Sequence, residues 1–170
     1  MNTQKITTSL WFDKEAEEAM NFYVDVFNNA PHSNKDSKIV SIDYYPDNVE
    51  EEHMKGMEGK VINGVFELAG QKYICLDGGP IFKFNEAISL TVDVEDQEEL
   101  DYFWEELSAV PESEQCGWCK DKYGLSWQII PKKLGELMAD SDKEKSGRVM
   151  TALLKMHKLD IAELEKAYNG

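Results

Sequence analysis

The sequence predicts an α+β fold made of two tandem βαβββ modules followed by a C-terminal helical extension. Three observations lead to this prediction. A strand-like segment followed by an amphipathic helical segment stands near the N-terminus, and the same pattern returns 80 residues later. Short alternating runs separated by glycine-containing turns follow each helical segment, as is typical of antiparallel strands. The residues after Pro131 carry helix-start signals and no strand pattern.

The first module begins with the strand-like segment TTSLWFD, and KEAEEAMNFYVDVF follows it with apolar residues at helical spacing. Asp13 is placed to cap this helix, because its carboxylate can accept from the free N–H groups of the first turn. KIVSIDYY is the second strand. VINGVFELAGQKYICLDGG predicts a hairpin that turns at Ala69-Gly70-Gln71.

An internal repeat supports the second module. SLWFDKEAEEAMNFYVDVF falls on SLTVDVEDQEELDYFWEEL when the chain is shifted by 80 residues, and both the helix start and the apolar stripe keep their places. SEQCGWCKDKYG and LSWQIIP then supply two further strands. The predicted domain covers residues 1–132, with modules at 5–79 and 86–132. Residues 133–170 form the extension, in which Ser141–Glu144 (SDKE) is a capping box and Asp160–Glu163 (DIAE) opens a second helix.

The composition of the chain excludes some classes of binding partner. The formal net charge of −15 and the pI of about 4.5 argue against nucleic acid and anionic membranes. No apolar run is long enough for a membrane span, and the first residues show no signal peptide. The odd count of three cysteines favours a reducing compartment. We therefore expect a cytoplasmic protein.

The CGWC stretch, Cys116–Cys119, resembles a redox pair or half of a zinc site. A redox cysteine of that kind stands at a helix N-terminus, whereas CGWC is followed by KDKYG and a strand. Within a strand, Cys116 and Trp118 would share one face and Cys119 would take the other, which disfavours a disulfide. We interpret both cysteines as structural, with redox chemistry as the alternative.

The segments GGPIFKFNEAISL and CGWCKDKYGLSWQ resemble the PhnB-like proteins, often labelled "3-demethylubiquinone-9 3-methyltransferase domain". These belong to the vicinal oxygen chelate superfamily, which contains glyoxalases, bleomycin-resistance proteins and dihydroxybiphenyl dioxygenases. The residues after Pro131 also resemble the C-terminal extension of that group. The resemblance implies half-barrel sheets around a cavity, and a homodimer. Methyl transfer is disfavoured, because the first strand ends in FDKEAEE without the glycine-rich turn that faces a nucleoside.

Metal-dependent members of the superfamily hold their metal at positions that the resemblance aligns with Thr7, Cys75, Ala87 and Gln128. These four side chains lack the converging imidazole, carboxylate or thiolate ligands that a divalent metal prefers. We therefore expect no metal at this place, while a metal bound through other ligands stays open. The three histidines, His32, His53 and His157, are expected on the surface.

The period of two along a strand assigns a polar face to each sheet, with Leu10, Phe12, Leu90 and Val92 on the helix side. The residues expected to line a ligand cavity are Thr7, Ser9, Trp11, Cys75, Asp77, Ser89, Thr91, Trp118, Ser126 and Gln128. The alternative is a solvated or dimer-buried face without a ligand.

Two functions stay open. The first is a metal-free module that binds a small organic molecule. The second is an enzyme of lyase, isomerase or dioxygenase type that acts on a small polar metabolite. Such an enzyme would use an unrecognised metal or acid–base help from Asp77 or Asp93. The sequence does not identify catalytic residues or the ligand.

Overall fold

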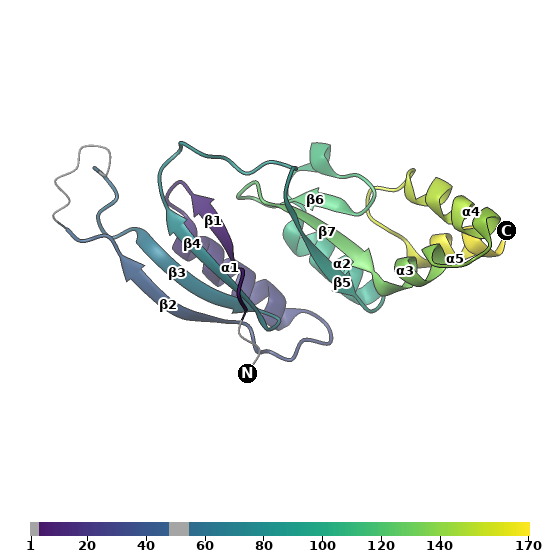
Figure 1. Cartoon of the computed structure of the whole chain (residues 1–170), viewed down its shortest axis with the longest axis horizontal. Coiled ribbons are helices and arrows are strands. Elements are labelled where there is room, and N and C mark those ends of the chain that lie inside the picture. The colour runs from purple at the N-terminus through teal and green to yellow at the C-terminus, as the bar shows by residue number, and fades with distance from the viewer. Residues whose placement is uncertain (1–3, 48–54) are drawn as a thin grey trace. The chain divides into compact units, whose positions relative to one another are not determined.

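The chain forms two compact units, Met1–Phe84 and Asn85–Gly170. The computed structural model describes residues 4–47 and 55–170. The Glu-rich segment at residues 46–60 lies partly outside the described residues, and His53 lies outside them. Each unit is built from one small mixed sheet and helices, and each is described by itself (Figure 1).

The first unit has a four-stranded sheet and one helix. Its elements are β1 (Thr8–Phe12), α1 (Ala16–Asn29), β2 (Lys38–Tyr44), β3 (Val61–Leu68) and β4 (Gln71–Asp77). The strand order is β1-β4-β3-β2, in which β1 runs parallel to β4 and the other pairs are antiparallel. A strand, a crossover helix and a parallel strand form the core of the unit, and the hairpin β3–β4 turns at Ala69-Gly70 as predicted.

Helix α1 covers one face of this sheet. Its spacing of apolar residues produces one continuous stripe, which is buried at Ala16, Ala19, Met20, Tyr23 and Val26. The sheet contributes the buried side chains Leu10, Phe12, Phe66, Leu68 and Cys75. The ring of Phe66 stacks between those of Tyr23 and Tyr73, which extends the contact from the helix across the sheet.

The second unit repeats this plan with three strands. Its elements are β5 (Ser89–Val94), α2 (Gln97–Leu107), the short 3₁₀ helix η2 (Pro111–Ser113), β6 (Trp118–Lys120) and β7 (Ser126–Pro131). The strand order is β5-β7-β6, with β5 parallel to β7. The apolar face of α2 buries Leu100, Phe103 and Leu107. Both β1–α1 and β5–α2 thus occupy the places that the internal repeat predicts.

Three helices follow β7. They are α3 (Lys132–Met138), α4 (Lys143–Leu153) and α5 (Ile161–Asn169), and α4 and α5 lie side by side (Figure 1). Leu159 and Leu164 are fully buried. Backbone hydrogen bonds from Cys116 N to Met156 O and from Gly117 N to His157 O, both 2.8 Å, join this extension to the loop before β6.

The α+β class is confirmed, with one difference in the second module. The first module is βαβββ, whereas η2 takes the place of a strand between α2 and β6. Pro111 explains the difference, because it has no N–H for a strand ladder and favours the first turn of a helix. The predicted domain bounds, residues 1–132 and 133–170, stay a prediction.

Two predicted helix caps are wrong. Asp13 does not cap α1; the first helical N–H, that of Ala16, donates to Asp77 Oδ1 at 2.8 Å. The cap of α4 is Asp142 rather than Ser141, and its carboxylate accepts from the N–H groups of Glu144 and Lys145. The prediction at Asp160 is confirmed, because its side chain accepts from Glu163 N.

None of the helices in the described part of the chain is long and apolar enough to cross a membrane.

Candidate functional site: the open sheet faces

The open face of the second sheet gathers small polar side chains. The register pairs Ser89 with Ser126 and Thr91 with Gln128, and Gln128 is also opposite Trp118 on β6. Residues directly opposite each other point to the same face, so these side chains lie together, away from α2. The alternate residues Val92, Val94, Trp127 and Ile129 are buried on the other face. The period of two predicted this side of the sheet, and the lining of a ligand cavity by these residues stays a prediction.

Ser126 is the most unusual residue of this face. It is only 1% exposed. Its Oγ is the one buried side-chain oxygen or nitrogen without a hydrogen-bond partner among residues 4–47 and 55–170. A buried hydroxyl without a partner loses its hydrogen bonds to water and gains none from the protein, and native structures contain few such groups. The position therefore points to a partner that the protein chain does not supply.

The neighbours of Ser126 offer complementary groups. Gln128 Nε2 donates to Ser89 Oγ at 2.9 Å, which orients the carboxamide and leaves its oxygen as an acceptor. On β6, Trp118 presents a partly buried indole, and Lys120 forms an ion pair with Glu86. The Lys120 ammonium lowers the pKa of the Glu86 carboxyl through this hydrogen bond. The face can therefore stack a planar group and exchange hydrogen bonds with it.

The open face of the first sheet is different in character. Ser9 is opposite Ile74 and Trp11 is opposite Leu76, so this face is largely apolar, where the sequence predicted Thr, Ser and Gln. The Trp11 indole donates to Gly79 O at 2.9 Å. Its ring meets Phe82 edge-on, with 4.9 Å between centroids. Gly78 is required beneath it, because a Cβ there would lie 2.1 Å from the ring.

Two residues predicted for the cavity lie on the helix side instead. Cys75 is opposite Leu10 and Asp77 is opposite Phe12, so both point towards α1. Asp77 is 1% exposed, and its two oxygens accept from Ala16 N at 2.8 Å and Val61 N at 2.9 Å. The carboxylate thus ties α1 to β3. This arrangement does not suit a general base facing a ligand.

The four positions aligned with a metal site do not fit a metal. Thr7 precedes β1, and Ala87 has no ligand atom. Burial raises the pKa of the Cys75 thiol to about 12, which keeps it protonated and a poor ligand. Register adds a further difference, because the residue of β4 that corresponds to Gln128 is Leu76. Among the described residues no group of three His, Cys, Asp or Glu side chains could hold a metal.

The CGWC stretch forms a turn and the start of β6. Cys116 and Gly117 both have positive φ, 52° and 84°, so Cys116 lies outside the strand in which it was expected. Cys119 is buried opposite Trp127, and burial raises its thiol pKa to about 12. Cys119 therefore fills an apolar position, as predicted. His32 and His157 are exposed, which confirms their surface placement.

Sequence reasoning missed several residues of these faces. Lys120 was missed although it stands two residues after Trp118 and so shares its face. Leu76 was missed because both faces of β4 are apolar and its register was not known. Phe82 lies in the segment after β4, where no strand period assigns a direction.

Comparisons with known proteins identify the family. A family model described as 3-demethylubiquinone-9 3-methyltransferase matches residues 4–130. A solved structure of a PhnB protein from Bacillus cereus, titled with the same methyltransferase name, shares 40% sequence identity. The match covers 75% of this chain and 99% of that chain, with a TM-score of 0.60. The chain belongs to this PhnB-like family.

Other solved structures resemble this PhnB-like chain more distantly. A protein from Pseudomonas aeruginosa has the same fold, with a TM-score of 0.56 at 14% identity over 76% of this chain and 98% of that one. A protein from Staphylococcus aureus is 28% identical over 76% of this chain and 97% of its own, with a TM-score of 0.33. No curated protein matches the chain. The family model ends at β7, so the resemblance predicted for the later helices stays a prediction.

Proposed function

We propose that this PhnB-like protein binds a small organic molecule on the open face of its second sheet, without the metal site of glyoxalase-type enzymes. The unpartnered hydroxyl of Ser126 carries the proposal. Because Ser126 Oγ is buried, the ligand must displace the groups that cover it. A ligand that then hydrogen-bonds to Ser126 Oγ and to the Gln128 carboxamide, and stacks on Trp118, would supply the missing hydrogen-bond partner. The ligand class is a small planar compound with an amide or hydroxyl substituent.

The family's methyltransferase name does not describe the proposed function. Methyl transfer from a nucleoside cofactor normally uses a doubly wound parallel sheet with a glycine-rich turn before its first helix. The two sheets here are mixed, with four and three strands. The turn between β1 and α1 reads Asp13-Lys14-Glu15 and contains no glycine. These features support binding rather than methyl transfer.

The enzyme alternative needs a catalytic group on these faces. Both oxygens of Asp77 are already bound to backbone N–H groups beneath α1. Asp93 is exposed at the end of β5. Neither arrangement favours catalysis over binding. The homodimer implied by the family resemblance remains part of the proposal.

Two serine variants test the role of Ser126. Ser126→Ala removes a buried hydroxyl without a partner, so the free energy of unfolding should stay the same or rise by about 1 kcal/mol. Ser37→Ala is the matched control, because Ser37 is also buried and its Oγ accepts from Ala69 N at 3.1 Å. That variant should lose about 1 kcal/mol. Urea unfolding measures both.

Binding is measured by NMR titration with benzamide and indole-3-carboxamide as probes, and by native mass spectrometry for co-purified molecules. Saturable shifts of the Trp118 indole and Gln128 amide signals are expected. Ser126→Ala should weaken the binding about three- to tenfold, the worth of one hydrogen bond. If Ser126→Ala destabilises the protein as Ser37→Ala does, or leaves the affinities unchanged, the proposed site is wrong.

A further inference from the structure

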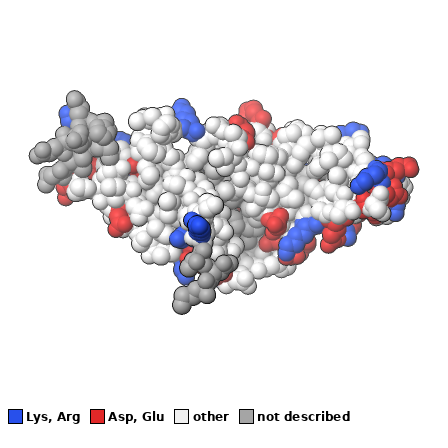
Figure 2. Space-filling view, in the orientation of Figure 1, with Lys and Arg blue, Asp and Glu red and all other residues white. Residues whose placement is uncertain are grey.

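A groove between α4 and α5 has no role in the function proposed above. It has a volume of about 780 Å³ and lies outside the part of the chain that the family model matches. Figure 2 shows charged side chains of both signs gathered over this end of the second unit. The lining residues are Lys143, Glu144, Gly147, Arg148, Thr151, Ala152, Lys155, Met156, Glu163, Lys166, Ala167 and Gly170.

The side-chain charge of the groove is positive. Its two carboxylates are paired with cations of the groove, Glu144 with Arg148 at 3.6 Å and Glu163 with Lys166 at 3.4 Å. The remaining cations, Lys143 and Lys155, form no ion pair within the described residues. A local excess of positive charge is notable in a chain with a net charge of −15. It favours an anionic partner.

The position of Lys143 is unfavourable for the stability of its own helix. Lys143 is the first residue of α4, where the macrodipole presents partial positive charge and disfavours a cation. The Asp140 carboxylate, which attracts Lys143 without forming an ion pair, offsets part of this cost, and a negative partner in contact with Lys143 would offset more.

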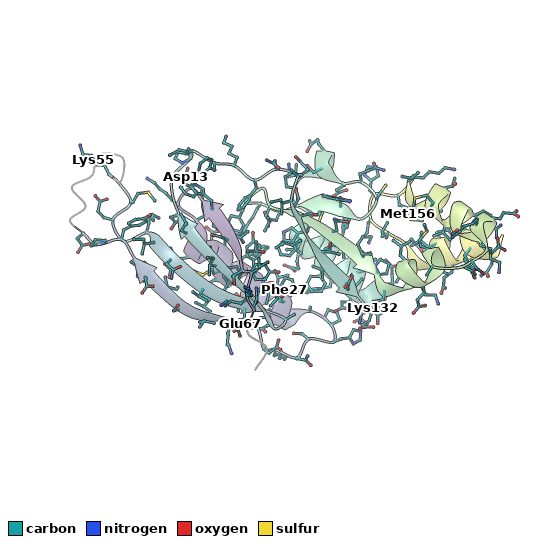
Figure 3. The ribbon with its side chains drawn as sticks, viewed as in Figure 1. Asp13, Phe27, Lys55, Glu67, Lys132 and Met156 are labelled. Atoms are coloured by element: carbon teal, nitrogen blue, oxygen red, sulfur yellow. The ribbon has the colours of Figure 1, made fainter. Side chains whose placement is uncertain are left out.

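The floor of the groove is apolar and made of small residues. Gly147, Ala152 and Ala167 leave room for close approach, and Met156 adds an adaptable side chain that Figure 3 labels beside α4. Met150 on α4, 39% exposed, and Leu154 at its C-cap, 60% exposed, are further exposed apolar residues that do not line the groove. A partner seated here would cover apolar surface as well as meet charge.

The two unpaired lysines stand at opposite ends of the groove. Lys143 begins α4 and Lys155 lies two residues past its end, and the helix between Lys143 and Leu153 alone spans about 15 Å. One carboxylate cannot neutralise both. An elongated partner with an apolar middle and acidic residues near both ends would, and a helix of three to four turns has this length.

We propose that this groove docks an acidic amphipathic helix of a different protein. A second copy of this chain does not supply one, because its acidic helices α1 and α2 already bury their apolar faces against their own sheets. The net charge of −15 opposes polyanions such as nucleic acid and anionic membranes more strongly than it opposes a peptide with a few carboxylates.

The probe is a fluorescein-labelled 15-residue peptide with glutamates at both ends and leucines at helical spacing between them. Fluorescence anisotropy with the full chain should show saturable binding that weakens as salt rises. Two peptides serve as controls, one with lysines in place of the glutamates and one with the same residues in scrambled order.

A matched pair of glycine variants tests the location. Gly147 lies in the groove and Gly135 lies on α3 outside it, and a Cβ at either position meets no atom within 4 Å. Both Gly147→Glu and Gly135→Glu should fold, because glutamate is a better helix former than glycine. Gly147→Glu should weaken peptide binding at least tenfold, whereas Gly135→Glu should leave it unchanged.

Charge is tested separately. The double variant Lys143→Gln, Lys155→Gln should weaken binding at least tenfold and flatten its salt dependence. Its control is Lys5→Gln, Lys83→Gln, which makes the same change of charge at exposed positions of the first unit. Neither pair touches Ser126, so benzamide binding reports independently on the open sheet face.

Three results would overturn the proposal. The first is no saturable binding of the acidic peptide, and the second is equal binding of the scrambled or lysine peptide. The third is binding of dodecanoate, but not of the peptide, with the same sensitivity to Gly147→Glu. That last result would assign the groove to small amphipathic carboxylates.

Discussion

At the scale of single residues, one buried aspartate organises each unit. Asp77 joins α1 to β3 through the backbone N–H groups of Ala16 and Val61. Asp121 accepts from the N–H groups of Tyr123 and Leu125 and, at 2.8 Å, from the Trp127 indole. A carboxylate can accept several hydrogen bonds at once, which explains why these charges tolerate burial.

Asp77→Asn should destabilise the protein by about 2–3 kcal/mol, because an amide cannot accept with both of its ends and leaves one buried N–H without a partner. Urea unfolding measures the loss. Asp25→Asn, at an exposed position of α1, should change the free energy of unfolding by less than about 0.5 kcal/mol. Equal effects of the two variants would contradict the role given to Asp77.

The three cysteines should differ in reactivity. Burial raises the pKa of the Cys75 and Cys119 thiols to about 12, so both stay protonated and shielded at pH 8, whereas Cys116 is partly exposed. The reagent DTNB at pH 8 should label one thiol per native chain and three in denaturant.

The same pKa values make the free energy of unfolding depend on pH. The unfolded thiols lose protons from about pH 9. The folded ones keep theirs to about pH 12. The free energy of unfolding should therefore fall as the pH rises through this window. A thiol titration that finds Cys119 reactive in the native protein would contradict its buried placement.

At the scale of elements, the helix N-termini show where the local sequence predicts the capping residue and where it does not. α2 and α5 begin with the aspartate caps Asp96 and Asp160, each accepting from the N–H three residues later. α1, which the repeat aligns with α2, is capped instead by Asp77, 61 residues away in sequence. The two modules thus share an element order without sharing the interactions that start their helices.

The cap of α4 can be tested with adjacent variants. Asp142→Ala should cost about 1 kcal/mol, because the N–H groups of Glu144 and Lys145 lose their acceptor. Ser141→Ala should change stability by less than about 0.5 kcal/mol. Amide hydrogen exchange in the first turn of α4 should accelerate only in the aspartate variant. Faster exchange in Ser141→Ala would instead support the capping box that the sequence predicts.

At the scale of the whole molecule, charge and apolar surface are distributed unevenly. The chain carries −15 overall, yet the groove between α4 and α5 has an excess of lysine and arginine. The open sheet faces also differ, since the second carries Ser89, Ser126 and Gln128 while the first carries Ile74 and Leu76. A duplicated fold has therefore diverged into two surfaces of different chemistry.

The sequence by itself determined the two modules, the order of helices and strands in the first, and the polar face of β5 and β7. These properties follow from local periodicity, which alternates polar and apolar residues along β5 and β7. Periodicity does not assign the faces of β4, because Tyr73 and Cys75 on one face are as apolar as Ile74 and Leu76 on the other. Only the pairing with β1 decides which of them meets α1.

Tertiary structure alone decided the roles of Asp77, Ser126 and the groove. Asp77 was predicted for a cavity because a sequence does not show which distant N–H groups will reach a carboxylate. Ser126 was predicted for the right face, but its unpartnered burial depends on what packs around it. The groove exists because α4 and α5 pack side by side, which brings Lys143, Lys155 and Lys166 to one surface.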